Sequence, residues 1–179
     1  RSTIQSSFHI PESGKIMALH PQDLLVLYKA VASPEHGGSI AGLAKGLGMS
    51  LSQVHRSVER CAEAGLASRD HGPFAPNPVA LLEFAVHGVR YAFAVKPGAS
   101  QRGIPTAHGA QPIAAEILNP EGDIPVWPDP NGTVRGPAIE PLSKYAVQAA
   151  LGDPKLHELL ALQDSLRIGR ARERARAEQ

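Results

Sequence analysis

The chain has 179 residues, of which 42% are hydrophobic and only 4% aromatic, so it can form one sizeable domain or two small ones around an aliphatic core. Its 18 Lys and Arg residues nearly balance 17 Asp and Glu residues, and the net charge of +1 excludes the strongly basic composition of a non-specific nucleic-acid coat. A single cysteine, Cys61, excludes an intramolecular disulfide framework and a cysteine-based zinc site.

The sequence carries no recognisable targeting signal. No apolar run approaches the roughly 18 residues that a membrane-spanning helix needs. The first residues also lack the basic start and apolar core of a secretory signal. We therefore expect a cytoplasmic protein with no membrane partner.

The N-terminal segment shows no hydrophobic periodicity and precedes Met17, a possible natural start. We predict that residues 1–16 form a flexible arm or are not native to the protein. The folded part is predicted to begin with a helix over His20–Ala32, because Pro21 suits the first helical position and apolar residues follow at helical spacing. These apolar residues are Leu24, Leu25, Leu27, Tyr28 and Val31.

Residues 39–66 have the pattern of two helices joined by a tight turn. Ser39 and Ser50 are each placed to cap a helix N-terminus. Gly48 lies where the first helix must end, since glycine adopts a left-handed conformation without a Cβ penalty. The second helix is predicted to bury one apolar stripe, made of Leu51, Val54, Val58 and Cys61. Cys61 is interpreted as a small buried hydrophobe, with a redox-sensing thiol as the alternative.

The run L-A-x-x-L-G-M-S, the two serine caps and the V-x-x-x-V spacing resemble the helix-turn-helix of winged-helix bacterial transcriptional regulators, broadly of the MarR-like kind. The resemblance covers Pro21 to about Pro76 and implies operator-DNA binding by a dimer. The DNA-binding domain is accordingly predicted over residues 17–76. It also implies a wing, for which Leu66–Pro76 is the hairpin candidate, with residues 70–73 at its tip. The expected fold class is mainly α with small β elements: a winged helix-turn-helix followed by an α+β C-terminal region.

Candidate DNA-binding residues lie on the second helix of this motif and in the hairpin. Polar side chains without an acid are predicted opposite the apolar stripe: Ser52, Gln53, Arg56, Ser57 and Arg60. Gln pairs with an adenine edge, Arg with guanine or phosphate, and Ser with phosphate oxygens. Four further residues complete the set of candidate DNA contacts. They are Ser50 at the N-cap of the helix, His55 at the edge of its polar face, and Arg69 and His71 in the predicted hairpin. An ordinary solvated helix face has a similar composition, and this alternative stays open.

The predicted DNA-binding segment has no net charge. Over residues 17–72 the cations Lys29, Lys45, Arg56, Arg60 and Arg69 are matched by the acids Asp23, Glu35, Glu59, Glu63 and Asp70. Since phosphate neutralisation supplies much of the affinity for DNA, a single copy is expected to bind weakly. A homodimer that contacts two half-sites is expected to bind more tightly.

Residues 77–179 are predicted to serve dimerisation, sensing or partner binding. A helix is predicted from Asn77-Pro78 to Gly88, followed by a strand over Val89–Val95. Residues 96–109 are predicted to be a loop, which is either an ordered surface loop or part of an anion or small-ligand pocket. A short helix is predicted over Pro112–Leu118.

The last third is predicted to contain a hairpin over Asp123–Val134, with its turn at Asn131-Gly132, and Trp127 is expected to anchor packing there. Helices are predicted over Pro137–Leu151 and from Asp153 to about Ala177. The final helix ends with Arg170, Arg172, Arg174 and Arg176. This basic end indicates a frayed, solvated terminus, a DNA-backbone contact or a surface for an acidic partner.

The sequence lacks the common catalytic patterns H-E-x-x-H and G-x-S-x-G and any Cys/His metal spacing. We therefore expect no enzymatic activity, no metal and no cofactor. The first functional hypothesis is a sequence-specific, dimeric transcriptional regulator that binds double-stranded DNA, most simply as a repressor. The alternative is an antitoxin-like interaction protein, which binds a partner enzyme through its C-terminal half and autoregulates through the helix-turn-helix.

Overall fold

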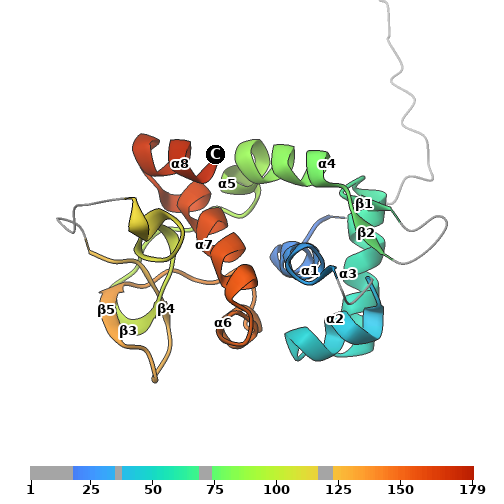
Figure 1. The fold of residues 1–179 in the computed structure, drawn as a ribbon, viewed down its shortest axis with the longest axis horizontal. Helices are drawn as coiled ribbons and strands as arrows, with labels where there is room; N and C mark the ends of the chain where they lie inside the picture. Colours follow the sequence, from blue (N-terminus) through green and yellow to red (C-terminus); the bar gives the residue numbers. More distant parts are fainter. Residues whose placement is uncertain (1–17, 35–37, 69–73, 117–122) are drawn as a thin grey trace, which may run out of the picture.

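The computed structural model describes residues 18–34, 38–68, 74–116 and 123–179 (Figure 1). Helices predominate, and two small antiparallel sheets accompany them: β1 (Ala67–Ser68) with β2 (Ala75–Pro76), and β3 (Ser100–Pro105) between β4 (Val126–Pro128) and β5 (Val134–Pro137). Within these residues, no helix combines the length and apolar character needed to cross a membrane. A mixed fold with many helices and small β elements is therefore confirmed.

Helix α1 (Pro21–Ala32) lies at the centre of the molecule, between α2 (Ile40–Leu47) and α3 (Leu51–Glu63) on one side and α7 (Pro154–Ile168) on the other (Figure 1). Its consecutive residues Leu24, Leu25, Val26 and Leu27 are at most 1% exposed, so the helix is buried on nearly every side. Val31, predicted on the buried face, is instead 42% exposed.

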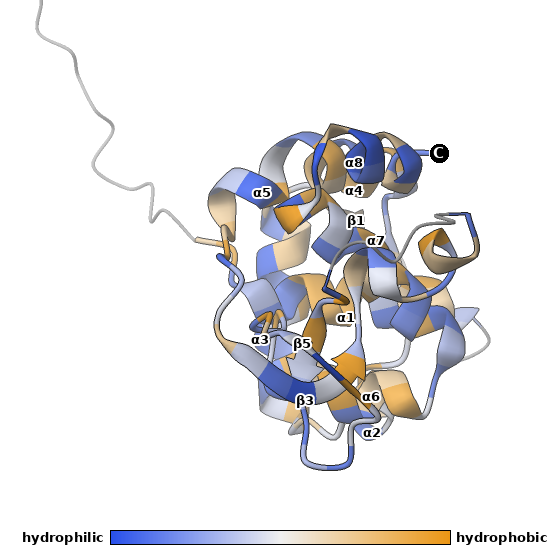
Figure 2. Cartoon of the chain, turned by 90° about the vertical axis from the view of Figure 1, so that its left-hand side faces the viewer, coloured by the Kyte–Doolittle hydropathy of each residue, from blue (hydrophilic) through white to orange (hydrophobic). Residues whose placement is uncertain are grey.

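One buried cluster joins the two halves of the chain. It runs from α1, α2 and α3 into α6 (Ala146–Leu151), α7 and the side chain of Trp127. In Figure 2 hydrophobic segments accordingly gather around α1. The predicted division at residue 76 does not separate two cores, and it stays a prediction about function.

The predicted helices over residues 39–66 are present as α2 and α3, and a short antiparallel ladder follows them. Ala67 of β1 lies opposite Pro76 of β2, and Ser68 lies opposite Ala75. Residues 69–73 between the strands lie outside the described residues, and so do the predicted DNA contacts Arg69 and His71.

A continuous helical segment comes next, formed by α4 (Pro78–Glu83), a π-helical turn η2 (Phe84–Gly88) and α5 (Val89–Ala92). The predicted strand over Val89–Val95 is therefore wrong, and Gly88 does not end the helix. Val89 is fully buried, and Phe93 packs edge-on against Phe84 with 6.3 Å between the ring centroids. Because Val89 and Phe93 are four residues apart, the apparent alternation conceals a helical spacing.

Strand β3 is the centre of the second sheet, although the sequence predicts a loop over residues 96–109. Both β4 and β5 pair with β3, antiparallel and on opposite edges. The predicted hairpin over Asp123–Val134 is therefore wrong, because its two strands flank β3. The segment that connects β4 to β5 crosses β3 at Gly103. A Cβ on Gly132 in this segment would lie only 2.2 Å from the Gly103 carbonyl carbon. This crossing requires glycine at position 132, whereas a Cβ on Gly103 would lie 2.0 Å from the Trp127 carbonyl oxygen.

Asp164 of α7 attaches this sheet to the helices. Its Oδ2 accepts hydrogen bonds from Thr106 Oγ1 at 2.8 Å and Trp127 Nε1 at 2.7 Å, and its Oδ1 accepts one from Arg167 Nη1 at 2.8 Å. The carboxylate is buried, so its acceptor atoms must be satisfied within the protein. The prediction that Trp127 anchors packing in this region is confirmed.

The C-terminal helices are shorter than predicted. Helix α6 covers only the last six residues of the predicted Pro137–Leu151 helix, Ala146–Leu151. Pro137 ends β5, and residues 138–145 form an isolated bridge, bends and a turn. The predicted final helix breaks at Gly169 into α7 and α8 (Ala171–Ala177), because the chain becomes extended there, with ψ 149°. A Cβ at Gly169 would lie 2.2 Å from the Ser165 carbonyl oxygen, so this turn also requires glycine.

Two single 3₁₀ turns, η3 (Ala107–Gly109) and η4 (Ile113–Ala115), complete the fold. The second replaces the short helix predicted over Pro112–Leu118, of which residues 117 and 118 lie outside the described residues.

Candidate nucleic-acid interface

The turn between α2 and α3 has the local chemistry that the sequence predicts. Gly48 ends α2 in the left-handed conformation, with φ 64°, and Met49 is buried between the helices. Ser50 caps α3 reciprocally with Gln53: the Gln53 N–H donates to Ser50 Oγ at 3.3 Å, and the Ser50 N–H donates to Gln53 Oε1 at 3.0 Å. This capping box fixes where α3 begins and how it leaves the turn.

The buried side of α3 differs from the predicted stripe at its first residue. Val54, Val58 and Cys61 are fully buried, as predicted. Leu51 is 59% exposed and therefore does not belong to the stripe. Ser57, by contrast, is fully buried.

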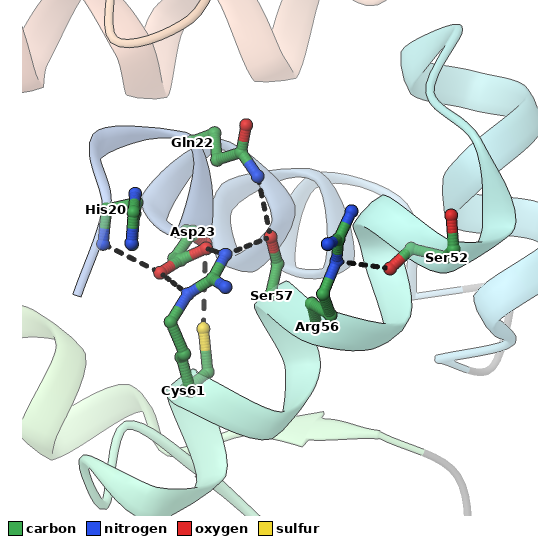
Figure 3. Close-up of polar contacts among 8 residues, drawn as sticks. His20, Gln22, Asp23, Ser52, Arg56, Ser57 and Cys61 are labelled. Atoms are coloured by element: carbon green, nitrogen blue, oxygen red, sulfur yellow. Dashed lines mark hydrogen bonds and ion pairs between the residues drawn. The ribbon is translucent and has the colours of Figure 1, made fainter. Parts of the chain in front are cut away.

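Two of the predicted DNA contacts, Ser57 and Arg60, instead attach α3 to α1 (Figure 3). Arg60 makes a bidentate pair with Asp23, with Nε donating to Oδ2 at 2.7 Å and Nη2 donating to Oδ1 at 2.6 Å. Ser57 Oγ accepts hydrogen bonds from Arg60 Nη2 at 3.2 Å and from Gln22 Nε2 at 3.4 Å. The bond to Asp23 raises the pKa of the Arg60 guanidinium. Ser57 is fully buried and Arg60 is held by Asp23, so both side chains have a positioning role within the fold.

Asp23 is the acceptor at the centre of this connection. Its side chain is 1% exposed, and its Oδ2 also accepts the His20 N–H at the start of α1, at 2.8 Å. A buried carboxylate needs such partners, since an unpaired charge in the interior is strongly unfavourable. The Asp23–Arg60 pair therefore sets the position of α3 on α1.

Cys61 lies beside this pair, with its Sγ 3.7 Å from the Asp23 carbonyl oxygen. Burial, together with the nearby Asp23 charge, raises the pKa of the Cys61 thiol to about 12. Since the thiolate is the reactive species, the native thiol should be inert near neutral pH. We expect Ellman's reagent to label Cys61 only after unfolding in urea; rapid labelling of the native protein would restore the redox-sensor interpretation.

The exposed polar residues of α3 are Ser52 and Arg56 in its first two turns and Glu63 at its end. Arg56 Nε donates to the Ser52 carbonyl oxygen at 3.3 Å, so its side chain lies along the helix surface (Figure 3). His55 is half-buried, and its Nδ1 lies 3.3 Å from Glu59 Oε1. The acid-free part of the exposed face is therefore limited to the first two turns, because Glu59 and Glu63 follow.

Gln53 connects α3 to the second half of the chain. Its Nε2 donates to Tyr145 Oη at 3.2 Å, and the Lys144 ammonium lies 5.1 Å from the centroid of the Tyr145 ring. These residues border a notch of about 260 Å³, lined by His20, Pro21, Gln22, Gln53, Leu142, Ser143, Lys144 and Tyr145. No local pattern in the sequence indicates that Lys144 and Tyr145 lie beside Gln53, which they follow by about 90 residues.

The basic C-terminal segment does not join this surface. Helix α8 packs against α7 and η4, and Figure 1 shows it on the side of the molecule away from α3. Arg176 Nε lies 3.3 Å from Glu116 Oε2, and Arg174 Nη1 donates to the Gly169 carbonyl oxygen at 2.7 Å. Two of its arginines therefore have partners within the fold.

The predicted ligand pocket over residues 96–109 is only partly assembled. Lys96 and Gln101 line an open hollow of about 550 Å³ with Glu140, whereas Thr106 is buried and bonded to Asp164. Among the described residues, no group of three or more His, Cys, Asp or Glu side chains is arranged to hold a metal ion. No known family model matches this chain, and no curated protein or solved structure shows a significant match to it.

Proposed function

We propose that this protein is a sequence-specific DNA-binding transcriptional regulator in which α3 is the recognition helix of a winged helix-turn-helix. The observation that carries the proposal is the first half of α3. A capped and rigidly positioned helix there presents Ser52 and Arg56 to solvent, with no acid before Glu59. The ladder of β1 and β2 follows α3 where a wing is expected.

The exposed groups suit the major groove. An α-helix with its side chains is about 10–12 Å wide and fits a groove about 12 Å wide. The guanidinium group of Arg56 can donate two hydrogen bonds to one guanine base. The hydroxyl group of Ser52 can bond to a base edge or to a phosphate. The partial positive charge at the N-terminus of α3 adds attraction for phosphates.

The acids further along α3 restrict how the helix meets DNA. Glu63 is exposed and Glu59 is half-buried, and both would be repelled by a phosphate backbone. We infer that α3 enters the groove with its first two turns and leaves its C-terminal end outside. Arg60 has a positioning role, because its guanidinium is held by Asp23.

We propose that the regulator acts as a homodimeric repressor. The neutral charge of residues 17–72 leaves one copy with few phosphate contacts, and two copies on adjacent half-sites double them. Light scattering of the full chain should give the mass of two copies. A monomeric mass at the concentration that saturates DNA would contradict the dimer.

An antitoxin-like interaction protein is the second candidate function, and one observation favours it. Val79 and Leu82 of α4 and Tyr91 of α5 are 77%, 58% and 75% exposed, and exposed apolar side chains of this size are common where proteins bind each other. In that case residues 77–179 would bind a partner enzyme, and α3 would serve autoregulation.

The test of the first function is a fluorescence-anisotropy titration of the full chain against the duplex upstream of its own gene. A shuffled duplex of equal length and composition is the control, and both are measured at two salt concentrations. We expect saturable binding that prefers the upstream duplex and weakens with salt. Equal affinity for both duplexes, or no binding at micromolar protein, would overturn the regulator and favour the partner-binding alternative.

A further inference from the structure

The notch beside Gln53 is formed by segments from both halves of the chain. The start of α1 contributes His20 and Gln22, α3 contributes Gln53, and the segment before α6 contributes Ser143–Tyr145. The side chains that line it offer an ammonium group, amides, hydroxyls and an imidazole, and no carboxylate is among them. Such a lining suits an anion.

Lys144 is the charged group of this notch. It is exposed, and the carboxylates of the described residues do not lie within ion-pair distance of its ammonium. By contrast, Lys29 and Arg60 are committed to Asp153 and Asp23 at 2.7 Å and 2.6 Å. The Tyr145 ring, 5.1 Å from the ammonium, gives only a weak cation–π attraction at an exposed site. The charge of Lys144 is therefore available to a ligand.

Tyr145 fixes where this charge lies relative to α3. Its ring is half-buried, and its Oη is bonded to Gln53 Nε2 at 3.2 Å. Gln53 precedes Arg56 by three residues, so it lies about one helical turn from it, at the edge of the exposed face. Lys144 therefore lies at the flank of the first two turns of α3.

A recognition helix that fills the major groove has a phosphate backbone along each flank, because helix and groove have similar widths. We propose that Lys144, held by Tyr145, binds a DNA backbone phosphate in this notch, so that the second half of the chain completes the DNA-binding surface. The inference rests on the proposed function and deepens it. Its ligand is the phosphate of the duplex, and a small free anion is the competing occupant.

The test compares the wild type with Lys144→Ala by anisotropy, using the upstream and the shuffled duplex over a series of salt concentrations. A contact with phosphate carries no sequence information, so both affinities should fall together, by roughly fivefold at moderate salt. The slope of log K against log salt should become shallower by about 0.9. Lys96→Ala is the matched control, since this exposed lysine lines the hollow beside the sheet and should leave affinity and slope unchanged.

The outcomes separate this inference from the function on which it rests. Failure of the wild type to bind either duplex would overturn both. A wild type that prefers the upstream duplex, with an unchanged slope in Lys144→Ala, would overturn the phosphate contact alone. Inorganic phosphate that perturbs the Tyr145 NMR signal at millimolar concentration, together with an unchanged slope in Lys144→Ala, would assign the notch to a small anion and also overturn the proposal.

Discussion

Replacing Arg56 with alanine should sharply reduce the preference of the protein for its specific duplex while leaving the fold intact. Arg56 is exposed, and its only bond among the described residues is to the Ser52 carbonyl oxygen within the same helix. The substitution therefore removes little stability from the folded state, and alanine is a good helix former. A bidentate arginine–guanine contact contributes about 1–3 kcal/mol of discrimination, so the specific affinity should fall roughly tenfold to a hundredfold.

The matched control for this variant is Arg135→Ala. Arg135 is also exposed, but it lies on β5, on the opposite side of the molecule from α3 (Figure 1). Its loss should leave the specific affinity unchanged, and the melting temperatures of both variants should match that of the wild type. Undiminished preference for the upstream duplex in folded Arg56→Ala would remove α3 from the recognition surface.

Asp23→Ala should strongly destabilise the fold. It leaves the Arg60 guanidinium, whose side chain is 13% exposed, without its carboxylate, and it removes the acceptor of the His20 N–H. Breaking a buried ion pair by removing one partner costs about 3–5 kcal/mol. Urea unfolding should show this loss as a lower midpoint with an unchanged slope.

Two further variants show whether loss of the Asp23–Arg60 ion pair itself is responsible for the destabilisation. Asp123 is exposed, and Asp123→Ala should change the free energy of unfolding by less than about 0.5 kcal/mol. The double variant Asp23→Leu with Arg60→Met should recover most of the stability, because replacing both charges leaves neither of them unpaired. A midpoint for Asp23→Ala equal to that of Asp123→Ala would refute the structural role of the pair.

Local signals in the sequence were sufficient for α1, α2 and α3. Ser50 and Gln53 cap α3 within four residues, and Gly48 allows a turn that a residue with a Cβ would strain. Val54, Val58 and Cys61 are buried at the spacing that the pattern predicts. Each of these features depends on neighbours in sequence, and sequence patterns report such neighbours directly.

The candidate site was predicted only in part, because its chemistry depends on distant residues. In the sequence, Arg60 looks like an exposed residue that could contact a DNA base. In the structure it pairs with Asp23, which lies 37 residues earlier in the chain. Ser57 is polar and still buried, because Gln22 and Arg60 satisfy its hydroxyl. No periodicity predicts such pairs, since they follow from how α1 and α3 cross.

The C-terminal half illustrates the same limit for the fold. Residues of β3 are interrupted by Gly103 and bounded by Pro105, a composition typical of a loop. They form a central strand because β4 and β5 pair with its two edges, and because Gly132 can cross at Gly103. Asn131-Gly132 is a genuine hairpin signal, but the crossing of the chain overrides it.

Thiol footprinting tests most directly whether DNA lies on the first two turns of α3. Because native Cys61 is buried, single cysteines introduced by Ser52→Cys or Ser100→Cys provide the reactive thiol, and both serines are exposed. We predict that the upstream duplex slows maleimide labelling of Ser52→Cys several-fold. Labelling of Ser100→Cys, on β3, should proceed at the same rate with and without the duplex. Under conditions where anisotropy shows the duplex bound, unchanged labelling of Ser52→Cys would contradict the assignment of α3 as the recognition helix.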